Sequence, residues 1–382
     1  MILLRVINIR PLFPSGIISL FAFVFQACLW PAPCYAQPKY AAIQLEIPGS
    51  PIFYGFGGTG GLSRDGAVAG YRRISPDLTL PIDQAVVWND AGIHTLLPVN
   101  ASYAQATAFG FAMGDNPVGG ISLNLGELIR PVIWEPSGPR FLESPTGFGG
   151  ALSGSKNYIA GCTLGGGLAA SYWDAAGFHA IGGLIGRDSQ AFSINNAGFY
   201  VGPSNHPTQG RAGFIGQNGT SKLLVHPNFP NTLAFDINDS NWVAGEYRPT
   251  DSQRAFVWHD DTFIDLGLFP GYNAAKAYAI NNDNTLVGGA SNYGGDVERA
   301  LVWFNGALTP QDLNEFVDIP GATLINGLDV NNAGQIFAEA RLDASAGGGY
   351  AYYVLTPIPE PAGLAIAFFA IAGSMNRPRR GG

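Results

Sequence analysis

The sequence predicts an all-β fold that repeats one unit of about 43 residues along the chain. The composition is the first observation: 52 of the 382 residues are glycine, 12% are aromatic and only 13% are charged, which is typical of short strands joined by many turns. Two short motifs that recur in step are the second observation. The third is the placement of Asn, Asp and Gly between apolar runs, where tight turns require a left-handed backbone.

The first motif is a branched residue, then polar Asn, Asp or Ser residues, then a short apolar run that ends in a small residue. In two of its best copies, residues 237–239 lead to Gly245 and residues 280–282 lead to Gly288. The seven copies end at intervals of 41–50 residues, at Gly70, Gly119, Gly161, Gly202, Gly245, Gly288 and Ala338.

The second motif is a short strand that usually ends in tryptophan, 12–18 residues after the end of the first motif. Gly216 and Tyr352 take the place of tryptophan in two copies. Because the tryptophans occupy strand positions of a repeat, we expect them to form the core of each unit and not exposed platforms for sugars. These structural residues are Trp88, Trp134, Trp173, Trp258 and Trp303.

Each unit is expected to contain four short strands. The apolar residues on either side of the Asn-rich turn form two of them, and a glycine-rich loop leads to the third, as at residues 254–258. A turn at residues 259–261 precedes the fourth strand, at residues 263–268. Four strands in this length correspond to one blade of a β-propeller.

Seven such units, from about residue 41 to residue 355, predict a propeller of seven blades. Residues 41–45 are expected to complete the last blade beside residues 350–355. A ring that is closed in this way leaves no open sheet edge, which matters for a β protein with no disulfide.

The N-terminal region predicts a signal peptide over residues 1–36. Arg5 and Arg10 precede an uncharged apolar stretch at residues 16–30, and small residues then lead to cleavage after Ala36. A basic start, an apolar middle and a small-residue exit follow in the order that a signal peptidase requires, which a buried N-terminal helix does not need. The expected partners of this segment are the Sec translocon and signal peptidase.

The C-terminal region predicts a sorting tail over residues 357–382, which leaves residues 37–356 as the propeller domain. Pro359, Glu360 and Pro361 precede an apolar run at residues 362–375. At about 1.5 Å per residue this run spans roughly 21 Å, short of a hydrocarbon core of about 30 Å, so a buried helix is the alternative. The basic residues that follow favour a transient membrane helix whose end stays cytoplasmic. They are Arg377, Arg379 and Arg380.

The ordered tail resembles the PEP-CTERM sorting signal of Gram-negative bacteria that make exopolysaccharide. The resemblance is carried by Pro359-Glu360-Pro361, the apolar run and the terminal arginines, with Pro378 as a small departure. It implies that an exosortase cleaves near the tripeptide. It also implies export across the inner membrane to the cell surface or a secreted matrix, with exopolysaccharide as a possible partner and membrane contact only through the tail.

The best units resemble the HAF-repeat family of exported bacterial proteins. The matching segments are residues 255–258, 265–267, 279–281 and 287–288, and Arg254 replaces the first His of the family pattern. The match is good over about residues 190–340 and faint before that. It implies a repeat fold and export, and it implies no activity.

Charge and cysteine content narrow the class of protein. The two end segments carry five arginines and, outside the Pro-Glu-Pro tripeptide, no acid, so the processed chain has 15 basic and 28 acidic residues and a net charge of −13. Nucleic acid is therefore not an expected partner, because it requires a basic face. Cys162 is the one cysteine after residue 36, which excludes an internal disulfide and favours a buried filler.

The sequence contains no recognisable catalytic set. No histidine pair has zinc-ligand spacing, and there is no Gly-x-Ser-x-Gly element. Residues 55–60 fit GxGxxG but lack the helix and distant acid of a dinucleotide site. We therefore predict no catalytic residue, no metal site and no cofactor. Calcium stays open as an alternative at the acidic turns 236–239 and 281–284, since their oxygens are hard ligands.

The leading functional hypothesis is a non-enzymatic repeat protein of the cell surface or extracellular matrix with a structural, adhesive or binding role. A propeller enzyme that cleaves polysaccharide, as a lyase or glycosidase, is one alternative, and a calcium-dependent lectin-like glycan binder is another. An enzyme requires residues that break the repeat to converge in one charged pocket. We expect them to scatter.

Overall fold

The computed structural model describes residues 38–45, 61–73, 83–89, 91–92, 94–97, 105–113, 115–122, 129–183, 188–206, 210–292 and 297–359. The predicted signal peptide with Ala36 lies outside the described residues. So does the sorting tail after Pro359, with Glu360, Pro361, Arg377, Arg379 and Arg380, and so does the glycine-rich segment 55–60.

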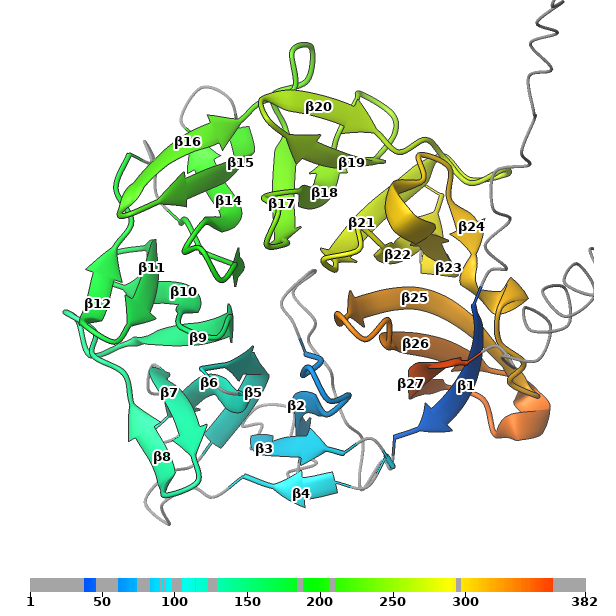
Figure 1. Cartoon of the computed structure of the whole chain (residues 1–382), viewed down its shortest axis with the longest axis horizontal. Coiled ribbons are helices and arrows are strands. Elements are labelled where there is room, and N and C mark those ends of the chain that lie inside the picture. Colours follow the sequence, from blue (N-terminus) through cyan, green and yellow to red (C-terminus); the bar gives the residue numbers. More distant parts are fainter. Residues whose placement is uncertain are drawn as a thin grey trace, which may run out of the picture. The chain divides into compact units, whose positions relative to one another are not determined.

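The described strands form seven antiparallel sheets that follow one another around a common axis (Figure 1). In each sheet the strand order matches the chain order from the axis outward, apart from the N-terminal strand. The first three complete sheets are β5 (Gln105–Ala112), β6 (Asn116–Ser122), β7 (Arg130–Glu135) and β8 (Gly138–Phe141); β9 (Gly149–Gly154), β10 (Ile159–Leu164), β11 (Leu168–Asp174) and β12 (Gly177–Ala180); and β13 (Ser193–Ile194), β14 (Tyr200–His206), β15 (Gly210–Gln217) and β16 (Thr220–Leu224).

Three further complete sheets continue the ring. They are β17 (Thr232–Ile237), β18 (Val243–Tyr247), β19 (Arg254–His259) and β20 (Thr262–Asp265); β21 (Ala274–Ile280), β22 (Leu286–Ser291), β23 (Val297–Trp303) and β24 (Gln311–Asp312); and β25 (Ala322–Val330), β26 (Ile336–Leu342), β27 (Tyr350–Ile358) and β1 (Lys39–Gln44).

The remaining sheet contains β2 (Val68–Arg73), β3 (Asp83–Trp88) and β4 (His94–Leu96), three strands among the described residues. The predicted all-β propeller is therefore confirmed. The prediction of seven four-stranded blades is not matched: the described residues form six four-stranded sheets, and the sheet of β2–β4 has three described strands. Helical structure in the described ranges is limited to three 3-10 turns, at Phe304–Gly306, Leu313–Glu315 and Ala344–Ala346.

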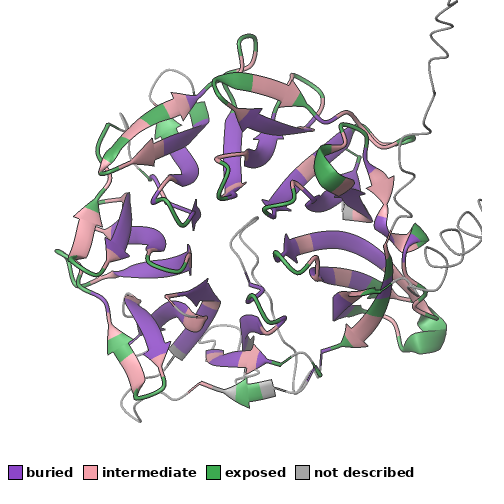
Figure 2. Cartoon of the chain, in the orientation of Figure 1, coloured by how far each residue is buried: buried purple, intermediate pink, exposed green. Residues whose placement is uncertain are grey.

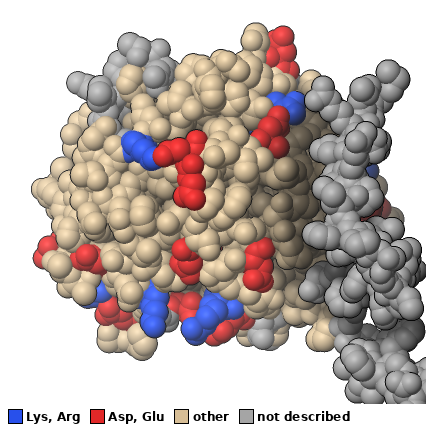
Figure 3. Space-filling view, turned by 45° about the horizontal axis from the view of Figure 1, so that its top comes forward, with Lys and Arg blue, Asp and Glu red and all other residues tan. Residues whose placement is uncertain are grey.

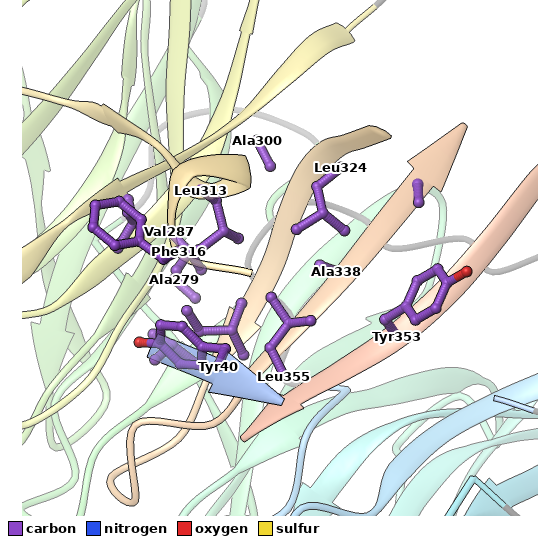
Figure 4. Close-up of a cluster of buried hydrophobic side chains, with 14 of the residues drawn as sticks. Tyr40, Ala279, Val287, Ala300, Leu313, Phe316, Leu324, Ala338, Tyr353 and Leu355 are labelled. Atoms are coloured by element: carbon purple, nitrogen blue, oxygen red, sulfur yellow. The ribbon is translucent and has the colours of Figure 1, made fainter. Parts of the chain in front are cut away.

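The N-terminal strand closes the ring, as the sequence predicts. β1 pairs antiparallel with β27, with Ala41 opposite Thr356 and Gln44 opposite Tyr353. Tyr40 on β1 is 6% exposed and packs among apolar residues of two sheets, including Val287 and Leu324 (Figure 4). The two ends of the described chain are therefore joined by both a strand ladder and an apolar core.

The repeat tryptophans lie in the apolar layers between neighbouring sheets, and each is less than 10% exposed. Figure 2 shows the same distribution for the whole ring: inner strands are buried, and exposed residues gather on outer strands and turns. Two copies depart from the pattern in an instructive way. The Cβ of a side chain at Gly216 would lie 2.5 Å from the ring of Tyr200, so that ring fills the space of the absent tryptophan. The tryptophan position can be followed in the pairing, because Trp258 lies opposite Val243. In the last sheet the equivalent position, opposite Ile336, is occupied by Leu355, so the prediction that Tyr352 takes the place of tryptophan is wrong.

A β-bulge recurs near the end of the inner strands and turns a large side chain toward the axis. The bulged residues include Phe235 on β17 and Tyr278 on β21, where the pairing skips one residue. They pack together with equivalent residues of other sheets in one apolar cluster. This cluster is made of Phe109, Leu152, Phe192, Leu233, Phe235 and Tyr278.

Among the described residues, no helix is long and apolar enough to cross a membrane. The apolar run at 362–375, which the sequence predicts to be a transient membrane helix, lies outside them.

Candidate functional site: a polar cavity at the propeller axis

A cavity of about 440 Å³ opens at the axis, beside the turns that follow the inner strands. Residues of all seven sheets line it, from Leu62 beside β2 to Asn332 after β25. The best copies of the first motif, at β13, β17, β21 and β25, end there in their branched residue and polar turn, so the repeat itself brings these polar groups together. In the part of the chain that the structure describes, all the units therefore contribute residues to this cavity.

A buried belt of asparagine side chains joins neighbouring sheets at this level. The Nδ2 of Asn195 donates to the main-chain oxygen of Asn238 (2.9 Å), which repeats the contact to Asn281 (2.9 Å). Asn281 donates to Asn331 (3.1 Å), and Asn331 donates to Ser63 (2.9 Å) across the junction of the last and first sheets. Each of these residues therefore forms its own turn and also links that turn to the next sheet.

A second, exposed belt lies one residue further along each turn. The main-chain nitrogen of Lys156 donates to Oδ1 of Asn196 (3.0 Å), and that of Asn196 donates to Oδ1 of Asp239 (2.9 Å). The main-chain nitrogen of Asp239 donates to Oδ1 of Asn282 (2.9 Å), and that of Asn282 donates to Oδ1 of Asn332 (2.8 Å). Hydrogen bonds from Asn196 and Asn282 to the carboxylate lower the pKa of Asp239, although burial acts in the opposite direction.

Asn238 offers a direct test of the buried belt. It is 4% exposed, and its Oδ1 accepts from the main-chain nitrogens of Ser240 and Trp242 (3.0 Å each). Asn238→Ala should lower the free energy of unfolding by about 1–3 kcal/mol, because the partners of this amide stay buried without it. Asn238→Asp keeps both acceptor contacts and should still lower the free energy of unfolding, because a carboxylate oxygen would then lie against the main-chain oxygen of Asn281. Urea unfolding measures both, and the exposed Asn228→Ala is the control, expected to change little.

Two carboxylates, Asp236 and Asp329, line the cavity at equivalent positions of β17 and β25. Oδ1 of Asp236 accepts from Ser193 Oγ (2.6 Å), and its Oδ2 accepts from the main-chain nitrogen of Ile280 (2.9 Å). Oδ2 of Asp329 accepts from the main-chain nitrogen of Leu62 (2.9 Å). Burial raises the pKa of both groups, and the nearby charge of Asp236 helps to raise that of Asp329 to about 7.

This raised pKa predicts a pH-dependent stability. Between about pH 4 and pH 7 the folded protein retains a proton on Asp329 that the unfolded chain has released, so this group makes the protein less stable as pH rises through that window. Wild type should lose up to roughly 4 kcal/mol from it between pH 4 and pH 8. Asp329→Asn should remove that part of the slope.

The measurement is the difference in unfolding free energy between wild type and Asp329→Asn as a function of pH. Comparing the two proteins removes contributions that they share. One of these is His226, whose pKa is lowered by burial and which makes the protein more stable as pH rises through part of this range. Parallel curves for the two proteins would contradict the assignment.

Charged residues that break the repeat converge on this cavity, so the expectation of scatter is wrong here. Arg64 and Asp115 form an ion pair (3.0 Å) at one side. Lys156, Asp239 and the two carboxylates of Asp236 and Asp329 also line it. In the view of Figure 3 most of the surface is uncharged, and acidic and basic side chains lie next to one another, several of them along the lower edge.

The residues singled out by the sequence outside this cavity have structural surroundings. His179 stacks on Tyr172 and lies 2.8 Å from Asp174. Cys162 is buried on β10, and burial raises the pKa of its thiol to about 11. In the described part of the chain there is no group of three or more His, Cys, Asp or Glu side chains that could hold a metal ion.

Sequence reasoning missed Asp329 and the joining role of the asparagines. It treated the acidic turn at 236–239 as a calcium alternative and did not connect it to Asp329. The signal that could have found the pair is positional: each aspartate directly precedes the branched residue of its turn, and so the two occupy the same register of the repeat.

The fold and this site define the chain as a β-propeller with a polar cavity on its axis. No family model and no curated protein sequence matches it. Among solved structures it is similar to YCF48 bound to D1 peptide (TM-score 0.49, 10% identity, 86% of this chain and 98% of that chain). It is also similar to the β-propeller domain of the Trilobed protease from Pyrococcus furiosus (TM-score 0.47, 9% identity, 76% and 92%). A third similar structure is a six-bladed, fucose-recognising lectin of Aleuria aurantia (TM-score 0.34, 13% identity, 85% of this chain and 97% of that chain). Similarity at these identities bears on the fold alone.

Proposed function

We propose that this chain is an exported, non-enzymatic propeller of the cell surface or exopolysaccharide matrix of a Gram-negative bacterium, with a structural or binding role. The observation that carries the proposal is that the polar side chains around the axis join neighbouring sheets by hydrogen bonds. Asparagines and aspartates there make hydrogen bonds to the main chain of the next sheet. Such bonds make a rigid ring, which suits a scaffold that presents loops.

Seven blades are part of this proposal, with β2–β4 as the incomplete one. Leu62 forms an isolated antiparallel bridge with Val68, just as Ile237 pairs with Val243. The turn between them is also the same: the Ser63 nitrogen donates to Ala67, as the Asn238 nitrogen donates to Trp242. These two contacts support the proposal that Leu62 has the same place in its unit as Ile237 has in the complete blade of β17–β20.

The proposed route to the surface rests on the two ends of the chain: a signal peptide over residues 1–36, a propeller over 37–356 and a sorting tail over 357–382. The test is expression of the full chain and of a chain without residues 359–382 in a host that has an exosortase. The full chain should lose its tail and reach the surface or medium, and the shortened chain should be exported but mis-sorted. Unchanged processing and location would refute the tail assignment.

A glycan-binding role is the second candidate, and the polar cavity is the observation that favours it. Its amides, hydroxyls and carboxylates are the groups that recognise sugar hydroxyls. A glycan array with and without calcium separates a calcium-dependent lectin, which loses binding on chelation, from a calcium-independent binder. The absence of any glycan signal would leave the scaffold role alone.

A polysaccharide-cleaving enzyme is the remaining alternative, favoured by the pKa of Asp329. A carboxyl group that titrates near pH 7 is suited to act as a general acid. Release of reducing ends or of unsaturated products from matrix polysaccharide, lost in Asp329→Asn, would establish it. The donors that already occupy Asp236 and Asp329 favour the structural role instead.

A further inference from the structure

The walls of the axial cavity differ from sheet to sheet at one register of the repeat. The position before the branched residue is Asp236 in β17 and Asp329 in β25, but Ala279 in β21 and Gly110 in β5. These two sheets therefore have no polar side chain at this register. A carboxylate there is particular to β17 and β25, where it accepts a hydrogen bond from the next sheet and also lines the cavity.

The cavity is also unbalanced in charge. Its lining contains two basic side chains, Arg64 and Lys156, against four acidic ones, which gives a net charge of −2 when all are ionised. Arg64 is engaged by Asp115 (3.0 Å). Lys156 is exposed, and the acidic groups at Asp236 and Asp329 are those whose charged form burial disfavours. A ligand with a positive charge would relieve this cost, and a ligand with a carboxylate would add to it.

The rim offers a different chemistry. The exposed residues Asn196, Asn282 and Asn332 line the cavity, and their amides combine donors with acceptors. Phe111 and Ile194 add apolar groups to the lining. Neutral polar groups next to apolar surface suit a ring with hydroxyl groups, and about 440 Å³ lies within the range of small-ligand sites.

We propose that this cavity binds a sugar residue with a free, protonated amine. The amine is placed toward Asp236 and Asp329, where charge-assisted hydrogen bonds are strongest, and the hydroxyls are placed toward the rim amides. This inference rests on the proposed binding role and names its ligand class. It excludes acidic sugars, and it ranks N-acetylated sugars well below those with a free amine.

The test is calorimetric titration of the exported, processed protein with the β-1,4-linked disaccharide of glucosamine and with its N-acetylated twin, which differs only in the amine. The glucosamine disaccharide should bind at millimolar concentration or better, and at least about tenfold more tightly than the twin. Equal binding of both sugars, or binding of neither, would overturn the proposal. Equal binding of lysine amide would show a cation site without sugar recognition, and displacement of the sugar by calcium chloride would show a metal site; either result would overturn it too.

Variants assign the binding to the cavity. Asp236→Ala, which copies the residue of β21, and Asp329→Asn should each weaken binding by at least about tenfold. Asp261→Asn is the matched control, because Asp261 pairs with Lys222 in the turn between β19 and β20, on the outer side of its sheet.

Lys156→Glu changes an exposed side chain and makes the lining more negative, so it should tighten binding while the fold stays intact. This variant keeps the proposal testable if an aspartate variant fails to fold, and weaker binding would contradict the proposal. Absence of binding alongside normal export and sorting would overturn the cavity assignment and leave the proposed location untouched.

Discussion

Replacing Trp303 with alanine should lower the free energy of unfolding by about 3–5 kcal/mol, the range for a large aromatic lost from a core. Trp303 is fully buried on β23, and its Nε1 donates to the main-chain oxygen of Leu266 (3.3 Å). It packs among residues of its own sheet and of the preceding one, including Ala244 and Val257. The substitution therefore leaves a cavity between two blades and an unpaired buried carbonyl, which is why the loss should be large.

The matched control for this experiment is Trp242→Ala. Trp242 is only partly buried and stacks on the ring of His259 with centroids 4.4 Å apart, so its loss should cost much less. Trp303→Phe should fall between the two, since it keeps part of the ring and loses the donor. Equal losses for Trp303→Ala and Trp242→Ala, measured by urea unfolding, would show that the repeat tryptophans do not form the blade core.

The order of strands within a blade could be predicted because it depends on local chemistry. Turns such as residues 260–261, where both residues have positive φ (46° and 59°), favour Asp, Asn or Gly whatever surrounds them. Ring closure could be predicted for a similar reason, since residues 41–45 form an additional strand before the first copy of the repeat and the last unit needs one. These features follow from short stretches of sequence and the need to satisfy every edge.

The candidate site could not be predicted in the same way, because its contacts join residues that lie one repeat or more apart. Asn238 looks like a turn former in the sequence, and it is one, yet its Nδ2 also bonds to Asn281 in the next sheet. Asp236 and Asp329 are two repeats apart, and their charges interact only because the ring curves. The repeat pattern gives the register of such residues, but it does not show which side chains face the axis.

The glycine that ends each first motif explains why the pattern ends in so small a residue. It lies on the second strand, opposite the bulge that turns a large side chain toward the axis. A Cβ at Gly288 would lie 1.8 Å from the main-chain oxygen of Lys276, and one at Gly245 would lie 2.1 Å from that of Leu233. In the last copy Ala338 takes this place and lies opposite Gly327. In that sheet the glycine is on the inner strand and the alanine is on the second strand, so the two strands can still approach closely.

Gly288→Ala should therefore destabilise the protein by about 3 kcal/mol, at the upper end for an overpacked core, because the atom it would contact is main chain and cannot rotate away. Gly150→Ala is the control: Gly150 also lies on an inner region of a sheet, but its added Cβ would be 3.7 Å from the nearest atom, an ordinary contact. That change should be close to neutral or slightly stabilising, since it restricts the unfolded chain. If both variants unfold at the same urea concentration, the bulge does not impose the glycine, and the conserved spacing of the repeat needs another cause within the second strand.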